Sequence, residues 1–322
     1  MAERGKIPIV AVVGPTASGK TSLAVDLALY YGGEVVSADS MQIYEGMDIS
    51  TAKPTAAEMR GVPHHLIGFV SQDVSFSVAD YCAAAKQITE DIHARGKKII
   101  LCGGTGLYIS SLLDNIIFGG AVADTSLREE LKRRVQGEGA AALLSELAEF
   151  DPETAQSLHV NNVGRIIRAI EVFKTTGVTM SEQKRRSKSV PSPYDACVIC
   201  LDAKERSFLY GRINKRVDKM LSDGLLFEAE HFYKSCSRGT SRWAIGCKEL
   251  APYFAGEKSI DEAVEDVKRA TRRYAKRQLT WFNKMDGIKK IYTDEHQGDG
   301  AILKAALEII ENSGIFHRGA SL

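Results

Sequence analysis

The chain has 322 residues, of which 44% are hydrophobic, and its 42 basic side chains nearly balance 41 acidic ones. This composition indicates a globular protein with a large core, of a length that suits two domains, and it demands no polyanionic partner for the chain as a whole. No stretch reaches the length of a bilayer span, and the first apolar segment leads into a glycine-rich loop rather than a signal cleavage site, so we expect a cytosolic protein without membrane contact.

The first motif follows the apolar segment 7–13 and precedes a helix-like stretch at 22–31. It is a complete G-x-x-x-x-G-K-[ST] phosphate loop, made of Gly14, Pro15, Thr16, Ala17, Ser18, Gly19, Lys20 and Thr21. The backbone N–H groups of such a loop and the positive end of the next helix bind phosphates. We expect Lys20 to contact the terminal phosphates and the Thr21 hydroxyl to ligate Mg²⁺.

Apolar strand candidates at 7–13, 34–38 and 97–102 alternate with helix-like stretches at 22–31 and 78–95. This alternation predicts an α/β fold, a parallel sheet with helices on both faces. Later apolar runs at 196–201 and 287–292 would complete that sheet. We therefore assign 1–118 and 194–322 to one catalytic core.

The residues between the two halves of the core, 119–193, change to amphipathic helices at 126–136, 140–149, 152–157 and 162–175. We interpret them as an inserted helical domain, with the basic, proline-containing stretch 184–193 as its flexible return. Six cysteines, Cys236 among them, are too scattered for a disulfide scaffold. Cys197 and Cys200 lie in an apolar run and favour a buried strand over a zinc site.

Two strand ends carry candidate chemistry. The strand 97–102 ends in Gly103–Gly106, where an ordinary P-loop nucleotidase has a magnesium-binding Asp. This loop fits either further phosphate contacts or a tight turn that needs glycine for its backbone angles. Asp39, after the strand 34–38, suits a magnesium ligand, a general base or a cap of the next segment. Ligands of parallel sheets bind at this edge, so the motifs should converge there.

The helix 262–283 places Tyr274, Arg277, Gln278 and Trp281 on one face, with further cations such as Arg272 nearby. Aromatic side chains among cations suit single-stranded nucleic acid, although by spacing alone a half-buried amphipathic helix with a solvated charged face is the commoner case. Arg212 and Arg216, four residues apart, suit either a diphosphate or an ordinary surface.

Seven ordered motifs, from the phosphate loop to the helix 262–283, resemble those of bacterial tRNA dimethylallyltransferases, also called tRNA isopentenyltransferases. They span residues 14–21, 37–42, 48–54, 63–66, 103–108, 165–171 and 275–281. Ser-Ala-Asp-Ser-Met-Gln at 37–42 and Lys-Arg-Gln-Leu-Thr-Trp at 276–281 are specific to that family, whereas the phosphate loop is generic.

The resemblance implies a P-loop-kinase-like core that transfers a dimethylallyl group from dimethylallyl diphosphate to the exocyclic amine of the adenosine 3′-adjacent to the anticodon of tRNA. It implies no ATP hydrolysis, because the phosphate loop then holds the prenyl diphosphate, with Mg²⁺. Asp39 matches the family's general base, and Thr105 and Arg216 match residues that bind the diphosphate. The expected partners are the tRNA anticodon stem-loop and the prenyl donor, for an enzyme that we expect to be a monomer.

For tRNA contacts the resemblance indicates four parts of the chain: 39–42, Arg128 in the insertion, 164–168 and 243–248. Gln42 would pair with a base beside the flipped target adenosine. Cys247 stands where the family usually has Tyr, and Asn162 and Gly164 replace Asp and Gln. The full set of expected tRNA-binding residues is Asp39, Ser40, Met41, Gln42, Thr105, Arg128, Gly164, Arg165, Ile166, Ile167, Arg168, Trp243, Ala244, Ile245, Gly246, Cys247, Lys248, Arg272 and Arg277.

Three alternatives remain at this stage. A P-loop kinase of a small metabolite would use Asp39 on a hydroxyl and consume ATP, but it leaves the basic helix and the insertion unexplained. An adenylate isopentenyltransferase would run the same chemistry on free nucleotide without needing the insertion. A non-enzymatic RNA-binding module is the third, and the intact Lys20, Thr21 and Asp39 count against it.

Overall fold

The computed structural model describes residues 5–118, 124–235, 241–296, 298 and 300–316, a range that omits Cys236. These residues form two compact units. Unit 1 lies within Met1–Leu113 and Pro193–Leu322, and unit 2 lies within Asp114–Ser192. The bounds of unit 2 differ by a few residues from those of the insertion expected at 119–193. In the described part of the chain, no helix combines the length and the apolar character needed to cross a membrane.

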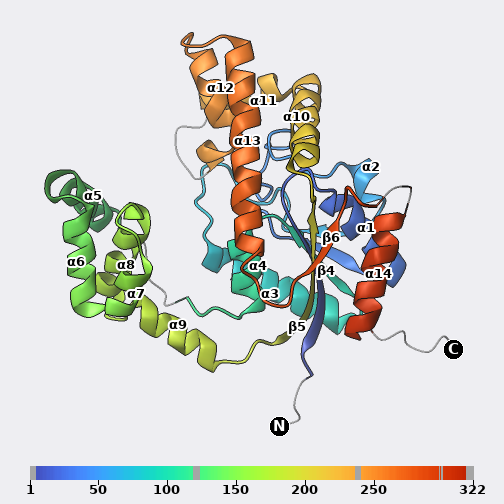
Figure 1. The fold of residues 1–322 in the computed structure, drawn as a ribbon, viewed down its shortest axis with the longest axis horizontal. Helices are drawn as coiled ribbons and strands as arrows, with labels where there is room; N and C mark the ends of the chain where they lie inside the picture. Colours follow the sequence, from blue (N-terminus) through green and yellow to red (C-terminus); the bar gives the residue numbers. More distant parts are fainter. Residues whose placement is uncertain (1–4, 119–123, 236–240, 297, 299, 317–322) are drawn as a thin grey trace. The chain divides into compact units, whose positions relative to one another are not determined.

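Unit 1 is built on a six-stranded sheet whose neighbouring strands are all parallel, in the order β3-β2-β4-β1-β5-β6 (Figure 1). This confirms the predicted α/β class. The strands are β1 Ile7–Val13, β2 Glu34–Ser37, β3 His64–His65, β4 Ile99–Gly103, β5 Tyr194–Asp202 and β6 Lys289–Tyr292. β1 lies between β4 and β5, and helices cover both faces of the sheet, so Ile9 to Val13 are completely buried. A strand covered on both faces has to be apolar throughout, as this one is.

Helices cover both faces of the sheet. On one face, apolar side chains of α1 Lys20–Tyr31 and α14 Ala301–Ser313 pack on the strands. On the other face lie α3 Val78–Ala94 and α4 Gly106–Leu113, joined by Phe282. The short α2 Ala56–Met59 begins at a capping box between Thr55 and Glu58.

The remaining helices of unit 1 form a second layer beyond the carboxyl ends of the strands (Figure 1). They are α10 Arg206–Ser222, α11 Leu225–Ser235, the 3₁₀ helix η1 Ser241–Trp243, α12 Cys247–Phe254 and α13 Ile260–Phe282. A separate apolar core, which includes Leu225, Leu250 and Val267, joins these helices to Ile43 and Tyr44 of the segment that follows β2. The second layer therefore covers the sheet edge at which the sequence motifs converge.

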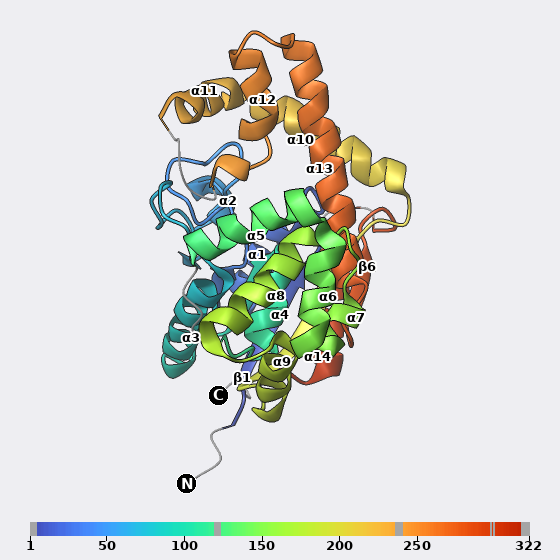
Figure 2. The same cartoon turned by 90° about the vertical axis from the view of Figure 1, so that its left-hand side faces the viewer.

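Unit 2 is entirely helical in its described part, and α5, α6 and α8 pack side by side around Leu131, Leu143 and Ile170 (Figure 2). Its helices are α5 Thr125–Glu138, α6 Ala140–Phe150, α7 Pro152–Ser157, α8 Val163–Thr176 and α9 Met180–Ser189. The expectation of a flexible return at 184–193 is wrong for most of that stretch, because α9 extends to Ser189. Thr179 caps this helix by accepting from the Glu182 N–H, and Glu182 pairs with Arg186 one turn later.

Candidate active site at the carboxyl edge of the sheet

The phosphate loop occupies the turn between β1 and α1. Gly14 has a φ of 141° and lies against the Leu201 carbonyl of β5, where a Cβ atom would clash. Gly19 caps α1 with a φ of 95°, in the left-handed region that glycine tolerates. The loop therefore curls at the positive end of α1, as an anion-binding turn requires. The helix begins at Lys20, two residues earlier than the sequence pattern indicated.

Lys20 lies partly buried beneath this loop. Its Nζ donates to the Pro15 carbonyl at 2.6 Å, rather than to a carboxylate. Burial lowers the pKa of Lys20 to about 8, with Cys102 opposing and Arg216 adding to the effect. The charged form of this lysine is disfavoured by desolvation, and a neighbouring negative charge offsets that cost. Lys20 should therefore favour an incoming anion strongly.

Asp39 begins a turn directly after β2 and faces the same edge. In the described part of the chain, both donors to its carboxylate reach one oxygen, Oδ1: the Met41 N–H at 2.9 Å and the Gln42 N–H at 3.3 Å. Oδ2 remains to accept from a ligand. Asp39 thus caps its own turn, one of the three predicted roles, in a geometry that leaves the other two open.

Thr105 is joined to this turn rather than to the phosphate loop. Its hydroxyl accepts from the Ser40 N–H at 2.9 Å and donates to Ser40 Oγ at 3.2 Å, while its own N–H donates to the Ala38 carbonyl. Neighbouring Gly103 packs so closely on the Ala38 backbone that a Cβ atom would clash. The predicted need for unusual backbone angles in Gly103–Gly106 is wrong, because none of these glycines has a positive φ. Close packing requires them instead.

Gln278 of α13 connects the two glycine-rich loops, a role that the sequence analysis missed. Its Oε1 accepts from the Thr16 N–H at 2.9 Å, and its Nε2 donates to the Gly104 carbonyl at 2.9 Å. The side chain is only 5% exposed. It belongs to the same helical face as Tyr274 and Trp281, so this face of α13 is directed at the sheet edge rather than simply at solvent. Its spacing alone did not reveal this.

A cavity of about 250 Å³ lies where these elements meet, entirely within unit 1. Lys20, Thr21, Asp39, Arg216 and Gln278 all contribute to its wall, whereas Thr105 does not. Burial lowers the pKa of the Arg216 guanidinium, while the charges of Asp39 and Glu58 raise it. Burial and the charge of Asp39 raise the pKa of the Tyr274 phenol well above its usual range. The complete wall is made of Thr16, Lys20, Thr21, Asp39, Ser40, Met41, Gln42, Ser50, Thr51, Ala52, Cys102, Gly103, Gly104, Arg216, Val217, Met220, Trp243, Ala244, Ile245, Val267, Thr271, Tyr274, Arg277 and Gln278.

Comparison with known proteins decides the family. A family model described as IPP transferase matches residues 42–285, well over half of the chain. The chain belongs to the IPP transferase family. The tRNA dimethylallyltransferase of Caldanaerobacter subterraneus is 47% identical over 294 residues, which make up 90% of this chain and 93% of that protein.

Solved structures agree with this assignment. The tRNA isopentenylpyrophosphate transferase of Bacillus halodurans has a TM-score of 0.71 at 42% identity, covering 96% of this chain and 98% of that one. A eukaryotic dimethylallyltransferase acting on tRNA has a TM-score of 0.80 at 27% identity, covering 94% of this chain and 79% of that one. The predicted family and fold class are confirmed.

The predicted contacts of this IPP transferase on α13 and α10 differ in exposure. Arg277 is exposed, lines the cavity and stacks over the Tyr274 ring at 5.6 Å. Arg272 is half-buried and donates to the Asn214 side chain on α10 at 2.7 Å, so it joins two helices. Arg212 is exposed and does not line this cavity, but together with Arg216 it lines a neighbouring cavity beside Gly19 and Lys20 of the phosphate loop.

The segment Trp243–Lys248 of the IPP transferase lies at the start of α12. Trp243, which is 57% exposed, carries the Lys248 ammonium over its ring at 5.6 Å, and with Ala244 and Ile245 it lines the cavity. Gly246 is buried, and Cys247 is 6% exposed. The Cys247 side chain therefore packs into the core of the second layer.

The predicted contacts in unit 2 lie on α5 and α8. Arg128 and Arg168 both donate to the completely buried Glu171 carboxylate, at 2.8 Å and 2.9 Å. Both guanidinium groups remain partly exposed. Gly164 and Arg165 are exposed in the first turn of α8, whereas Ile166 and Ile167 are buried in the core of unit 2. The two isoleucines therefore anchor α8 in the core of unit 2, while Gly164, Arg165 and Arg168 remain at the surface.

Proposed function

We propose that this chain transfers a dimethylallyl group from dimethylallyl diphosphate to the exocyclic amine of the adenosine 3′-adjacent to the anticodon in tRNA, releasing diphosphate. One observation carries the proposal. A single cavity is lined by two partly buried cations, Lys20 and Arg216, and by the Asp39 carboxylate. The relatives are named for a prenyl transfer to tRNA, which favours this substrate over free adenylate.

The phosphate loop would bind the diphosphate. Lys20 and Arg216 both lie in low-dielectric surroundings, where a fixed cation stabilises developing negative charge most strongly. As the C1–O bond of the prenyl donor breaks, its electron pair and charge move onto the diphosphate oxygens. The backbone N–H groups at the start of α1 add donors that need no rearrangement during the reaction.

Asp39 would act on the acceptor amine. The amine nitrogen forms the new bond to C1 and loses one proton, which Oδ2 of Asp39 accepts. Because Oδ1 is held by the Met41 and Gln42 N–H groups, the carboxylate keeps one orientation. Thr105, expected beside the breaking bond, would support this turn through Ser40 and could reach a diphosphate oxygen only by exchanging its present acceptor.

We propose that Mg²⁺ binds together with the diphosphate, at the Thr21 hydroxyl. In the described part of the chain, no group of three His, Cys, Asp or Glu side chains could hold a metal by itself. The residues present fit Mg²⁺, because this ion commonly keeps several waters and is bound through phosphates with one or two protein oxygens. When bound, it would neutralise charge on the leaving diphosphate.

The anticodon stem-loop would contact the exposed Trp243, Lys248 and Arg277 beside the cavity, and Arg128, Arg165 and Arg168 of unit 2. We propose that the enzyme acts as a monomer in the cytosol.

The experiment that tests this function is incubation with labelled dimethylallyl diphosphate and Mg²⁺, together with either unmodified tRNA or AMP. We expect label in tRNA alone. Label in AMP would instead identify an adenylate isopentenyltransferase, and consumption of ATP without any prenyl transfer would identify a kinase.

A further inference from the structure

The loop at residues 48–52 forms part of the cavity wall, through Ser50, Thr51 and Ala52. It contains neither a regular helix nor a strand, so its shape depends on specific contacts. Within the loop, the Ala52 N–H donates to the Ile49 carbonyl, and the Thr51 hydroxyl donates to the Met47 carbonyl. These bonds close the turn but leave the N–H groups of residues 48–50 to another partner.

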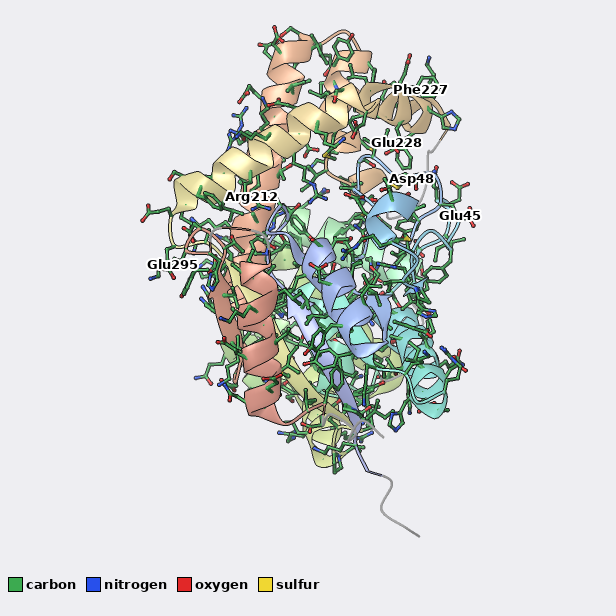
Figure 3. The ribbon with its side chains drawn as sticks, turned by 90° about the vertical axis from the view of Figure 1, so that its right-hand side faces the viewer. Glu45, Asp48, Arg212, Phe227, Glu228 and Glu295 are labelled. Atoms are coloured by element: carbon green, nitrogen blue, oxygen red, sulfur yellow. The ribbon has the colours of Figure 1, made fainter. Side chains whose placement is uncertain are left out.

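That partner is Glu228, in the first turn of α11. Its Oε2 accepts from the Asp48 N–H at 2.9 Å and from the Ile49 N–H at 2.7 Å, and its Oε1 accepts from the Ser50 N–H at 2.8 Å. Glu228 and Asp48 lie side by side although they are far apart in the chain (Figure 3). Three charge-assisted hydrogen bonds to consecutive N–H groups hold a loop much more firmly than one neutral bond does.

The direction of this side chain is specific. Its neighbour Phe227 is 80% exposed, so the start of α11 lies at the surface, and Glu228 is the residue that turns towards the loop (Figure 3). The loop also packs against two glycines of the second layer. A Cβ atom at Gly224 would contact Ile49, and one at Gly246 would contact Ser50. The loop 48–52 therefore lies between the start of α11 and the segment that precedes α12. We call the three hydrogen bonds from residues 48–50 to Glu228 the clamp.

The far side of the loop holds Gln42. Its Nε2 donates to the carbonyls of Thr51 at 3.2 Å and Ala52 at 3.0 Å. Both amide hydrogens are then engaged, and Oε1 accepts a long hydrogen bond from the Ser37 hydroxyl at 3.5 Å. This oxygen has a second lone pair that can accept from a base N–H. Because Gln42 lines the cavity, any displacement of the two carbonyls would rotate its amide there, and Oε1 with it.

We infer that Glu228 is a positioning residue for tRNA recognition, acting through the loop 48–52 to fix the Gln42 side chain. The inference rests on the proposed function and on the sequence-based expectation that Gln42 pairs with a base beside the flipped target adenosine. Glu228 does not line the cavity, so it acts through the loop rather than on a substrate.

The test compares Glu228→Ala and Glu228→Gln with the matched control Glu230→Ala. Glu230 lies on the same helix and pairs with Lys234, four residues later. Hydrogen exchange of peptides covering residues 42–53 reports on the clamp without any substrate. Steady-state kinetics with dimethylallyl diphosphate and anticodon stem-loops that differ only at the bases flanking the target report on recognition.

We expect Glu228→Ala to speed exchange at residues 48–50 and to lower kcat/KM for the preferred stem-loop about 10- to 100-fold, because small displacements near a reacting group are costly. The KM for dimethylallyl diphosphate should stay within about two-fold of the wild-type value, since the phosphate loop is untouched. The variant should also discriminate less between flanking bases. Glu228→Gln, which keeps one acceptor oxygen, should be intermediate, and Glu230→Ala should match the wild type.

Unchanged exchange in Glu228→Ala would overturn the clamp. Faster exchange with unchanged base discrimination, or equal losses on every stem-loop, would overturn the role in recognition, because a smaller active fraction cannot alter a ratio between substrates. A wild-type chain that labels no RNA would instead overturn the proposed function, and the unmodified protein alone reveals that outcome.

Discussion

Replacing Gln278 by Met removes the connection between the two glycine-rich loops while nearly keeping the side-chain volume. The change deletes two hydrogen bonds of 2.9 Å and leaves the Gly104 carbonyl and the Thr16 N–H without their partner. A buried polar group without a partner costs about 1–3 kcal/mol. Gly104 is buried and should cost close to that full range, whereas the half-buried Thr16 can recover some hydration. We therefore expect the free energy of unfolding to fall by about 2–4 kcal/mol.

Denaturant unfolding of the free protein measures this loss, with Lys276→Met as the control on an exposed position of the same helix. The control should change the free energy of unfolding by less than about 0.5 kcal/mol. Because Thr16 belongs to the phosphate loop, Gln278→Met should also raise the KM for dimethylallyl diphosphate. A loss below about 1 kcal/mol together with an unchanged KM would refute the bridging role, because even one unpaired buried group should cost that much.

Three other predictions follow from the site. Asp39→Ala should abolish turnover with only a modest loss of tRNA affinity, measured by single-turnover labelling and filter binding; equal losses would contradict a role on the reacting amine. The lowered pKa of Lys20, about 8 against 10.5, means that the unfolded chain binds more protons between these values, so the stability of the free protein should rise with pH across that window. In Lys20→Met the stability of the free protein should rise less steeply with pH, and the use of the prenyl donor should be impaired more than tRNA binding. Parallel curves of stability against pH for the two proteins would argue against the shifted pKa of Lys20. Arg277→Ala should reduce the salt slope of tRNA binding by about 0.7–0.9, whereas Arg272→Ala, which loses a bond to Asn214, should lower the melting temperature and keep the slope. An unaltered slope for Arg277→Ala would favour a merely solvated side chain.

Much of the sheet could be predicted because its central strands contain continuous apolar runs. β1, β4 and β5 are covered on both faces, so continuous apolar runs mark them in the sequence. β3 could not be predicted in this way, since it has two residues, His64 and His65, and pairs only with β2. The helix α9 was missed because its charges suggested a solvated linker, although Thr179 and Glu182 carried a readable cap signal.

The candidate site was only partly readable for a different reason. Asp39 directly follows β2, and Lys20 and Thr21 begin α1 after the loop at the end of β1, so the parallel topology brings these short motifs together. Gln278 and Glu228 act on residues 174 to 262 positions away, and no local pattern encodes such a partner. Their roles appear only when the second layer is folded over the sheet.

The register of β5 against β1 has a consequence for synthesis on the ribosome. Residues 7–13 pair on one side with residues 194–200, which emerge only after the whole of unit 2 has been made. Unit 2 is contiguous in sequence and has its own apolar core, so it can acquire its native packing first. The sheet of unit 1 cannot be completed until β5 has been made, so one edge of β1 stays unpaired in the nascent chain. We expect chaperones to protect that edge.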